Sequence, residues 1–226
     1  MKKSVLSALI AATLISAPAL AHQAGDIIVR AGAVMVAPNE SSQDVDLTGL
    51  GLPNLGEFSV DNNTQLGLNF GYMITDNIGI ELLAATPFKH TVSLAGIDIA
   101  ETKHLPPTLV AQYYFGDAQS KLRPYIGLGV NFTNFFDNEF KSDANAKVEQ
   151  ALGTNLKLDN LSLSNSWGVA AQVGLDYQVN KNWLVNGSIW YADISTDVKF
   201  DTVAGPLEYK ADIDPWVYMI SVGYVF

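Results

Sequence analysis

The sequence contains no cysteine, and charged residues make up only 16% of its 226 residues. The absence of cysteine excludes disulfide bridges, thiolate metal sites and sulfur-based redox chemistry. Soluble domains typically carry about 25% charged residues, so this chain is poor in charge. Positive charge is especially scarce, because 13 Lys and Arg stand against 23 Asp and Glu, for a net charge of −10. A chain this acidic offers no basic face to phosphates, and we expect no nucleic-acid partner.

Long apolar runs are also missing, except near the N-terminus. Residues 1–21 open with Lys2 and Lys3, continue with a short apolar stretch and end in small residues. The stretch is shorter than the roughly 20 residues that a spanning helix needs. The pattern predicts a secretory signal peptide that is cleaved before His22, followed by one domain over residues 22–226.

Strict alternation dominates the rest of the chain. In residues 64–74, "TQLGLNFGYMI", large apolar side chains occupy one face, and Gly, Asn and Gln occupy most of the other. A period of two is that of a β-strand. The same pattern recurs in residues 27–35, 78–82, 109–115, 126–132, 167–177, 185–191 and 216–226. The sequence therefore predicts an all-β protein with about eight strands.

The connections between these segments alternate in length. The short ones are 75–77, 116–124 and 180–182, and the long ones are about 37–62, 88–104, 137–163 and 194–213. Alternating connection lengths and a fully apolar outward face are typical of outer-membrane barrels. A soluble sandwich would have shorter strands and a polar outward face. We predict an eight-stranded antiparallel transmembrane β-barrel with short periplasmic turns and long extracellular loops, embedded in the outer-membrane lipid of a Gram-negative bacterium.

The chain ends on an alternating strand, "DPWVYMISVGYVF". Lipid offers no hydrogen-bond partners, so the sheet must close and the last strand must pair with the first. Tyr224 and Phe226 then belong to the aromatic girdle on the periplasmic side. A terminal Phe after alternating apolar residues also resembles the signal that delivers barrels to the insertion machinery, and we expect Phe226 to be recognised there.

Four charged residues lie on the inward face near the periplasmic end: Asp26, Arg30, Glu81 and Asp176. Buried charges are usually tolerated when they are paired with one another. We therefore predict a charged periplasmic floor inside the barrel. Such a floor is either a polar plug that fills a narrow barrel or part of a proton or ion path.

Two large apolar residues, Leu83 and Trp190, share the inward face with small residues. Side chains normally fill an eight-stranded barrel. The pattern is consistent with a hydrocarbon-lined slot for a ligand and also with simple packing of the interior.

Several stretches resemble the OmpW family of outer-membrane proteins. They are "NNTQLGLNFGYMITDNIGIELLAATPFKH" (62–90), "HLPPTLVAQYYFGDA" (104–118), "FFDN" (135–138), "SWGVAAQVGLDY" (166–177) and "DPWVYMISVGYVF" (214–226). The resemblance covers essentially the whole chain and is weakest in the loops around 39–56 and 143–160. It implies an eight-stranded barrel with a narrow apolar channel for small hydrophobic molecules, in which Leu83 and Trp190 form the constriction.

Three prolines are predicted to lie at the same level of the barrel wall. If the hairpin between them turns near Gly96, Pro87 lies almost opposite Pro106 and Pro107. Proline cannot donate to a β-ladder, so three missing donors predict a weak place in the wall. A hydrophobic ligand would leave sideways here into the bilayer; alternatively, the prolines lie just above the membrane, where a frayed ladder costs little.

Enzymatic and metal sites find little support in the sequence. His90 and His104 flank a loop with Ser93, Asp98 and Glu101, but loop spacing does not establish a His-Ser-acid site or a metal pair. We therefore predict no enzymatic activity, cofactor or metal, and a channel for small hydrophobic molecules. The alternative is a closed structural or receptor barrel whose extracellular loops bind external ligands.

Overall fold

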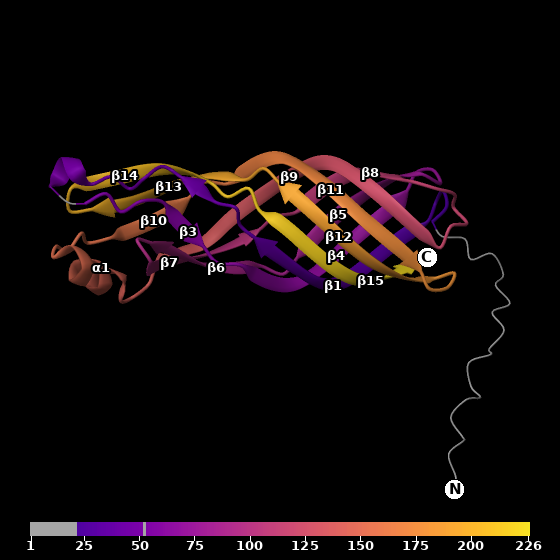
Figure 1. Ribbon diagram of the computed structural model, residues 1–226, viewed down its shortest axis with the longest axis horizontal. Coiled ribbons are helices and arrows are strands. Elements are labelled where there is room, and N and C mark those ends of the chain that lie inside the picture. The colour runs from indigo at the N-terminus through magenta and orange to yellow at the C-terminus, as the bar shows by residue number, and fades with distance from the viewer. Residues whose placement is uncertain (1–21, 52) are drawn as a thin grey trace, which may run out of the picture.

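A computed structural model describes residues 22–51 and 53–226. The expected signal peptide, residues 1–21, lies outside the described residues. In the described part, eight strands close into an antiparallel barrel (Figure 1). In barrel order these strands are β1 (Ile27–Ala37), β4 (Asn63–Met73), β5 (Ile78–Ala85), β8 (Thr108–Tyr114), β9 (Leu122–Phe140), β11 (Ser166–Gln178), β12 (Trp183–Ala192) and β15 (Trp216–Val225). The predicted fold class is confirmed.

The last strand closes the barrel against the first, as predicted. β15 pairs antiparallel with β1 from Ile28 opposite Val225 to Ala37 opposite Trp216. The backbone N–H of Phe226 adds one more bond, to the carbonyl of Ile27 at 2.9 Å. Pairing both strands satisfies the backbone groups that an open sheet edge would leave in lipid.

The wall continues beyond the barrel into an extension, at the end of the molecule opposite the C-terminus (Figure 1). The long extracellular connections predicted from the sequence form this extension, and much of their length is itself β-strand. The extension contains the hairpins β6 (Phe88–Leu94) with β7 (Ile97–Leu105) and β13 (Ser195–Thr202) with β14 (Gly205–Asp212), the end of β9, and β2 (Ser41–Ser42), β3 (Phe58–Val60), β10 (Asp159–Leu163), the 3-10 turn η1 (Thr48–Leu50) and α1 (Ala144–Leu152). Among the described residues, no helix is long and apolar enough to cross a membrane.

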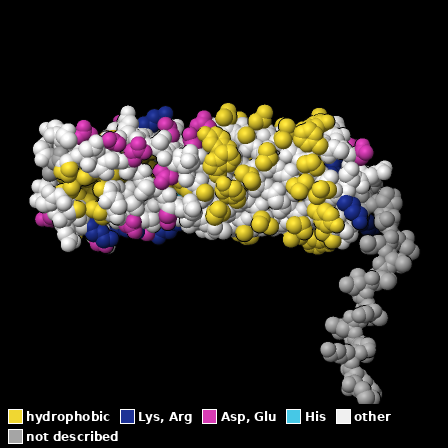
Figure 2. Space-filling model, in the orientation of Figure 1, with side chains coloured by type: hydrophobic (Ala, Val, Ile, Leu, Met, Phe, Trp, Pro, Cys, Tyr) yellow, Lys and Arg dark blue, Asp and Glu magenta, His cyan; other side chains and the backbone are white. Residues whose placement is uncertain are grey.

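Apolar side chains are spread over the outside of the barrel, whereas on the extension acidic and basic groups surround a smaller apolar patch (Figure 2). On the barrel, Leu128, Trp167 and Ile220 are each more than 70% exposed. Aromatic pairs mark both rims of this surface. Trp183 contacts Tyr224 at one rim, and Trp167 contacts Phe132 at the other, with ring centroids 5.0 and 4.7 Å apart. This surface is the lipid-facing belt of a transmembrane barrel with its two aromatic girdles.

Candidate functional site

An ion cluster fills the periplasmic end of the barrel. Arg30 on β1 is at its centre and donates one guanidinium nitrogen to Glu81 on β5 and another to Asp176 on β11. The second nitrogen also donates to the hydroxyl of Tyr114 at 2.9 Å. All four side chains are buried. The structure thus brings together three of the four residues expected in the floor.

The fourth residue, Asp26, is not part of this cluster. It lies in the turn before β1, where its carboxylate accepts the backbone N–H of Gln23 at 2.8 Å. His22 takes the expected place, with its Nε2 2.7 Å from the carboxylate of Asp176. Arg123 donates to the carbonyl of His22 at 2.8 Å. The alternation of β9 places Arg123 on the inward face, so its position could have been predicted from the sequence. Nothing in the sequence indicated that His22 turns into the barrel.

Amides and a phenol form a polar layer on the extracellular side of the ion cluster. Gln172 donates to Glu81 at 3.0 Å and accepts from Gln112 at 2.9 Å. Asn186 donates both to Asp176 at 2.7 Å and to the hydroxyl of Tyr125 at 2.9 Å. The ion cluster and this layer, together called the polar plug below, form one hydrogen-bonded network across the lumen. Such connected networks are the condition under which buried polar groups are stable.

An inward glycine makes room for this plug rather than for a ligand. A Cβ atom at Gly174 would lie 2.2 Å from the ring of Tyr125, which is far inside van der Waals contact. Tyr125 is itself only 1% exposed. The small inward residues that suggested an open slot are therefore, at this height, matched to large polar neighbours.

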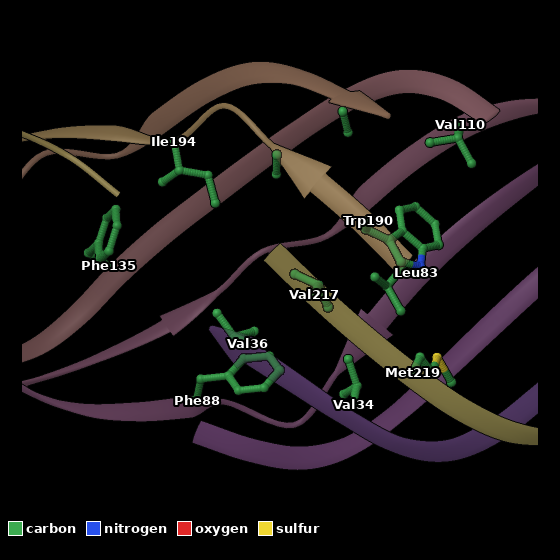
Figure 3. Close-up of a cluster of buried hydrophobic side chains, with 12 residues drawn as sticks. Val34, Val36, Leu83, Phe88, Val110, Phe135, Trp190, Ile194, Val217 and Met219 are labelled. Carbon is green, nitrogen blue, oxygen red and sulfur yellow. The ribbon is translucent and has the colours of Figure 1, made fainter. Parts of the chain in front are cut away.

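An apolar layer lies on the extracellular side of the plug, and Leu83 and Trp190 belong to it (Figure 3). Both side chains are buried, and the indole N–H of Trp190 donates to the hydroxyl of Ser188 at 3.2 Å. Their apolar neighbours include Val34, Val36, Phe88, Val110, Val217 and Met219. A small cavity of about 20 Å³ adjoins this layer and is lined by Leu83, Trp190 and residues of the wall. We call it the side cavity.

A larger cavity of about 350 Å³ occupies the extension, and we call it the vestibule. Its lining is mostly apolar and comes from β3, β6, β7, β13, β14 and α1, through residues such as Phe58, Leu94, Ile99, Val148, Phe200 and Leu207. His104 and Ile194 line both cavities, which therefore adjoin. Sequence reasoning missed the vestibule because it treated these segments as loops.

The prolines interrupt the wall at the height of the side cavity. The ladder between β5 and β8 ends with Leu83 opposite Thr108, and the ladder between β6 and β7 starts with Phe88 opposite His104. In the described chain, residues 84–87 consequently have no ladder partner among residues 105–107. Of the residues on either side of this break, Ala84, Ala85 and Pro106 line the side cavity.

The neighbouring seams of the wall differ. Toward β9 the wall is continuous, because the carbonyl of Pro107 accepts the N–H of Phe132 at 3.0 Å. Toward β4 the last backbone bond runs from Thr86 to Leu66 at 3.0 Å, and β6 pairs with β3 and β7 instead of β4. Pro87 therefore lies where the pairing between neighbouring strands is interrupted. Pro107, in contrast, is hydrogen-bonded to the adjacent strand β9.

The two histidines meet in the vestibule wall. Their Nε2 atoms are 3.0 Å apart, and their rings stack with centroids 4.9 Å apart. Ser93 does not join them, because its hydroxyl donates to Asp98 at 2.7 Å, and Glu101 pairs with Lys89 at 2.6 Å. Across the residues that the structure describes, no group of three His, Cys, Asp or Glu side chains is placed to hold a metal ion.

Both histidines lie in the extension, outside the membrane-spanning strands, and both are shifted toward the neutral form. Burial lowers the pKa of His104 to about 3, and the neighbouring His90 adds to the effect. Burial also lowers the pKa of His90, against the opposing hydrogen bond to Asp61. At neutral pH the pair is therefore uncharged.

Acid should loosen the β6–β7 hairpin. An unfolded His104 takes up a proton near pH 6.5, whereas the folded one does so only near pH 3. Between these values the unfolded state binds more protons, so stability falls as pH falls, by about 1.4 kcal/mol per pH unit at most. Hydrogen exchange of the hairpin amides at pH 7 and pH 5, corrected for intrinsic rates, measures this. Exposed carboxylates such as Asp98 also lower the stability as the pH falls. The control is therefore His104→Phe, in which acid should increase the exchange rate clearly less than in the unmodified protein. An equal increase in both proteins would contradict the role of His104.

Comparison with known proteins agrees with this architecture. Residues 23–226 match the model of the OmpW family. The chain is 50% identical to outer membrane protein W of Escherichia coli and 48% identical to that of Vibrio cholerae, in each case over the whole of both chains. The crystal structure of OprG from Pseudomonas aeruginosa superimposes with a TM-score of 0.81 at 42% identity, over 92% of this chain and 98% of that one.

These relatives fix the location and the class of the protein. It is a barrel embedded in the lipid of the outer membrane of a Gram-negative bacterium. The barrels of this family are not enzymes, in agreement with the prediction from the sequence. The match over almost every described residue, together with full-length relatives at half identity, shows that this chain belongs to the OmpW family of outer-membrane proteins.

Proposed function

We propose that this protein takes up small hydrophobic molecules in its vestibule and passes them into the outer membrane. The observation that carries the proposal is a mostly apolar cavity of about 350 Å³ that adjoins a second cavity beside a break in the barrel wall. Ligand sites are typically concave, mostly apolar and about 300–1,000 Å³ in volume. The vestibule fits that description and belongs to the extracellular part of the molecule.

The polar plug argues against passage straight through the barrel. An apolar molecule moving toward the periplasm would have to displace the contacts of Arg30 with Glu81 and Asp176. It could not replace them, because hydrocarbon neither donates nor accepts hydrogen bonds, and unpaired buried charges are costly. Water-filled ion passage is equally opposed by a network that spans the lumen. The plug is therefore a stopper in this proposal, rather than a proton or ion path.

The remaining route is sideways, through the break between residues 84–87 and 105–107. Ala84 supports this route, since it shares the outward parity of Leu82 and yet lines the side cavity. This small residue, which lines the side cavity together with Pro106, then separates the cavity from lipid. In this route Leu83 and Trp190 form the constriction that turns the cargo toward the break. Pro107, tied to Phe132, keeps the adjacent seam closed.

Restoring backbone donors at the break tests the route. We expect Pro87→Val combined with Pro106→Val to slow the delivery of pyrene into vesicles whose outer leaflet contains lipopolysaccharide, because the two strands can then pair across the break. Pro206→Val, on an exposed position of β14, is the matched control and should leave delivery unchanged. Full delivery by the double variant would refute the lateral route. Absence of delivery by the unmodified protein would instead favour a closed structural or receptor barrel.

Phe226 remains the expected contact of the insertion machinery. Its ring is 70% exposed and touches Tyr224 with centroids 4.7 Å apart, while its backbone is tied to β1. An accessible terminal aromatic on an otherwise paired strand is compatible with recognition before the barrel closes.

A further inference from the structure

The contacts of the histidine pair define which ring nitrogens carry protons. Nδ1 of His90 is 2.6 Å from the backbone carbonyl of Asp61. A carbonyl oxygen only accepts, so this Nδ1 carries the proton, and Nε2 of a neutral His90 carries a lone pair. Nε2 of His104, 3.0 Å away, must then be the donor between the two rings. The second nitrogen of His104, Nδ1, is consequently an unprotonated acceptor.

This acceptor has no partner. In the part of the chain that the structure describes, Nδ1 of His104 is buried and makes no hydrogen bond. Threonine hydroxyl groups on β7, β8 and β9 donate elsewhere: Thr102 to Asn138, Thr108 to the carbonyl of Pro106, and Thr133 to Asn131. Buried polar atoms without a partner are uncommon, and each calls for a physical explanation.

The surroundings of His104 are those of a ligand contact. Its side chain lines both the vestibule and the side cavity. Its ring is stacked on Phe88, with centroids 5.3 Å apart, and touches Phe135 at 5.8 Å. The aromatic rings and the bond to His90 hold the imidazole in place, so its lone pair is oriented before any ligand arrives. Preorganisation of this kind reduces the cost of binding.

We infer that His104 Nδ1 accepts a hydrogen bond from a neutral hydroxyl group on an otherwise apolar ligand, which makes the vestibule selective for medium-chain alcohols over pure hydrocarbons. The inference rests on the proposed uptake function and names its preferred ligand class. A carboxylate brings no donor to the lone pair, and an ammonium group would carry its charge into a mostly apolar cavity. A hydroxyl group supplies one donor and brings no charge into the cavity.

Two isomeric ligands isolate the hydroxyl. 1-Decanol and 1-methoxynonane have the same atoms, but only the alcohol has an O–H donor. We expect the protein in lipid nanodiscs, after subtraction of binding to empty nanodiscs, to prefer 1-decanol by about tenfold, the effect of one buried hydrogen bond. His104→Phe combined with His90→Phe keeps the aromatic stack and removes both imidazole acceptors, so this double variant should bind both ligands about equally.

The outcomes separate this inference from the proposed function. Equal binding of both ligands by the unmodified protein would overturn the role of His104 and leave hydrophobic uptake standing. Binding of neither ligand would overturn both. A preference that persists in the double variant would assign the hydroxyl contact to another residue and reject the inference.

A measurement on the unmodified protein covers the case in which the double variant does not fold. Nitrogen-15 NMR of the histidine rings should show His104 protonated on Nε2 and unprotonated on Nδ1. Addition of 1-decanol should shift the Nδ1 resonance toward that of a protonated nitrogen, and 1-methoxynonane should not. The opposite tautomer, or no shift with the alcohol, would contradict the inference.

Discussion

Replacement of Arg30 by Met should lower the free energy of unfolding of this barrel by about 3–5 kcal/mol, the usual cost of removing one partner from a buried ion pair. The loss is large because Glu81 and Asp176 would remain buried without their common cation. His22 replaces only part of that charge, through Asp176. Urea unfolding of the refolded barrel in lipid vesicles, compared with the unmodified protein, measures the difference.

A charge-neutral triple variant is the matched control. Arg30→Met together with Glu81→Gln and Asp176→Asn removes the cation and both carboxylates while nearly preserving their shapes. Because no uncompensated charge remains, this variant should recover most of the stability lost in Arg30→Met. If the single variant is as stable as the unmodified barrel, the carboxylates are reached by water, and the plug does not seal the lumen.

Ala84→Trp should reduce the delivery of pyrene by about tenfold. The indole would occupy the break between residues 84–87 and 105–107. A ligand that passes it must displace packed side chains, which costs about 1–3 kcal/mol, as for other overpacked sites. Ala33→Trp, on the exposed face of β1, places the same ring against lipid away from the break. Delivery should be normal in that control. The measurement is the rate at which pyrene appears in vesicles whose outer leaflet contains lipopolysaccharide.

Normal delivery by both tryptophan variants would place the exit elsewhere in the wall. The gap between β4 and β6 would then be the next candidate, because these two strands do not pair and the last backbone bond before the gap runs from Thr86 to Leu66. Equal slowing of both variants would instead indicate a general defect in folding or insertion, which the urea unfolding curves would reveal.

The barrel itself could be predicted because lipid imposes a simple pattern. Every lipid-facing position must be apolar, so the alternation in residues 64–74 or 216–226 is almost uninterrupted. Closure of the sheet also follows from the lack of hydrogen-bond partners in lipid, and the pairing of Phe226 with Ile27 agrees with it. Because contact with lipid constrains each strand on its own, each strand can be predicted from its own residues.

The extension could not be predicted for the converse reason. Its strands face water on one side, so polar residues such as Asp98 and Lys103 interrupt the apolar pattern of β7. Gly, Asn and Ser in these segments then favour loops over strands on local grounds alone. The buried apolar residues become a core only after several segments assemble, and their pairing depends on contacts far apart in sequence. The vestibule is a product of that assembly.

Part of the candidate site could be predicted from the alternation of inward and outward residues along the strands. Arg30, Glu81 and Asp176 were found because inward charges in a narrow barrel must meet. His22 was missed because it precedes the first strand, where parity has no meaning. The histidine pair was noticed as two loop residues, but its contact required the register of β6 and β7, which places His90 opposite Thr102 and Phe88 opposite His104. Register is set by the bulge at Val92 and Ser93, which the sequence alone does not locate.

The most direct test of the central claim follows cargo and ions in the same vesicles. Proteoliposomes with lipopolysaccharide in the outer leaflet receive external pyrene, while the ion permeability of the same preparation is recorded. If apolar molecules leave sideways above a sealed plug, the protein accelerates the appearance of pyrene in the bilayer and adds no ion conductance. Conductance through the barrel without accelerated pyrene delivery would contradict this account.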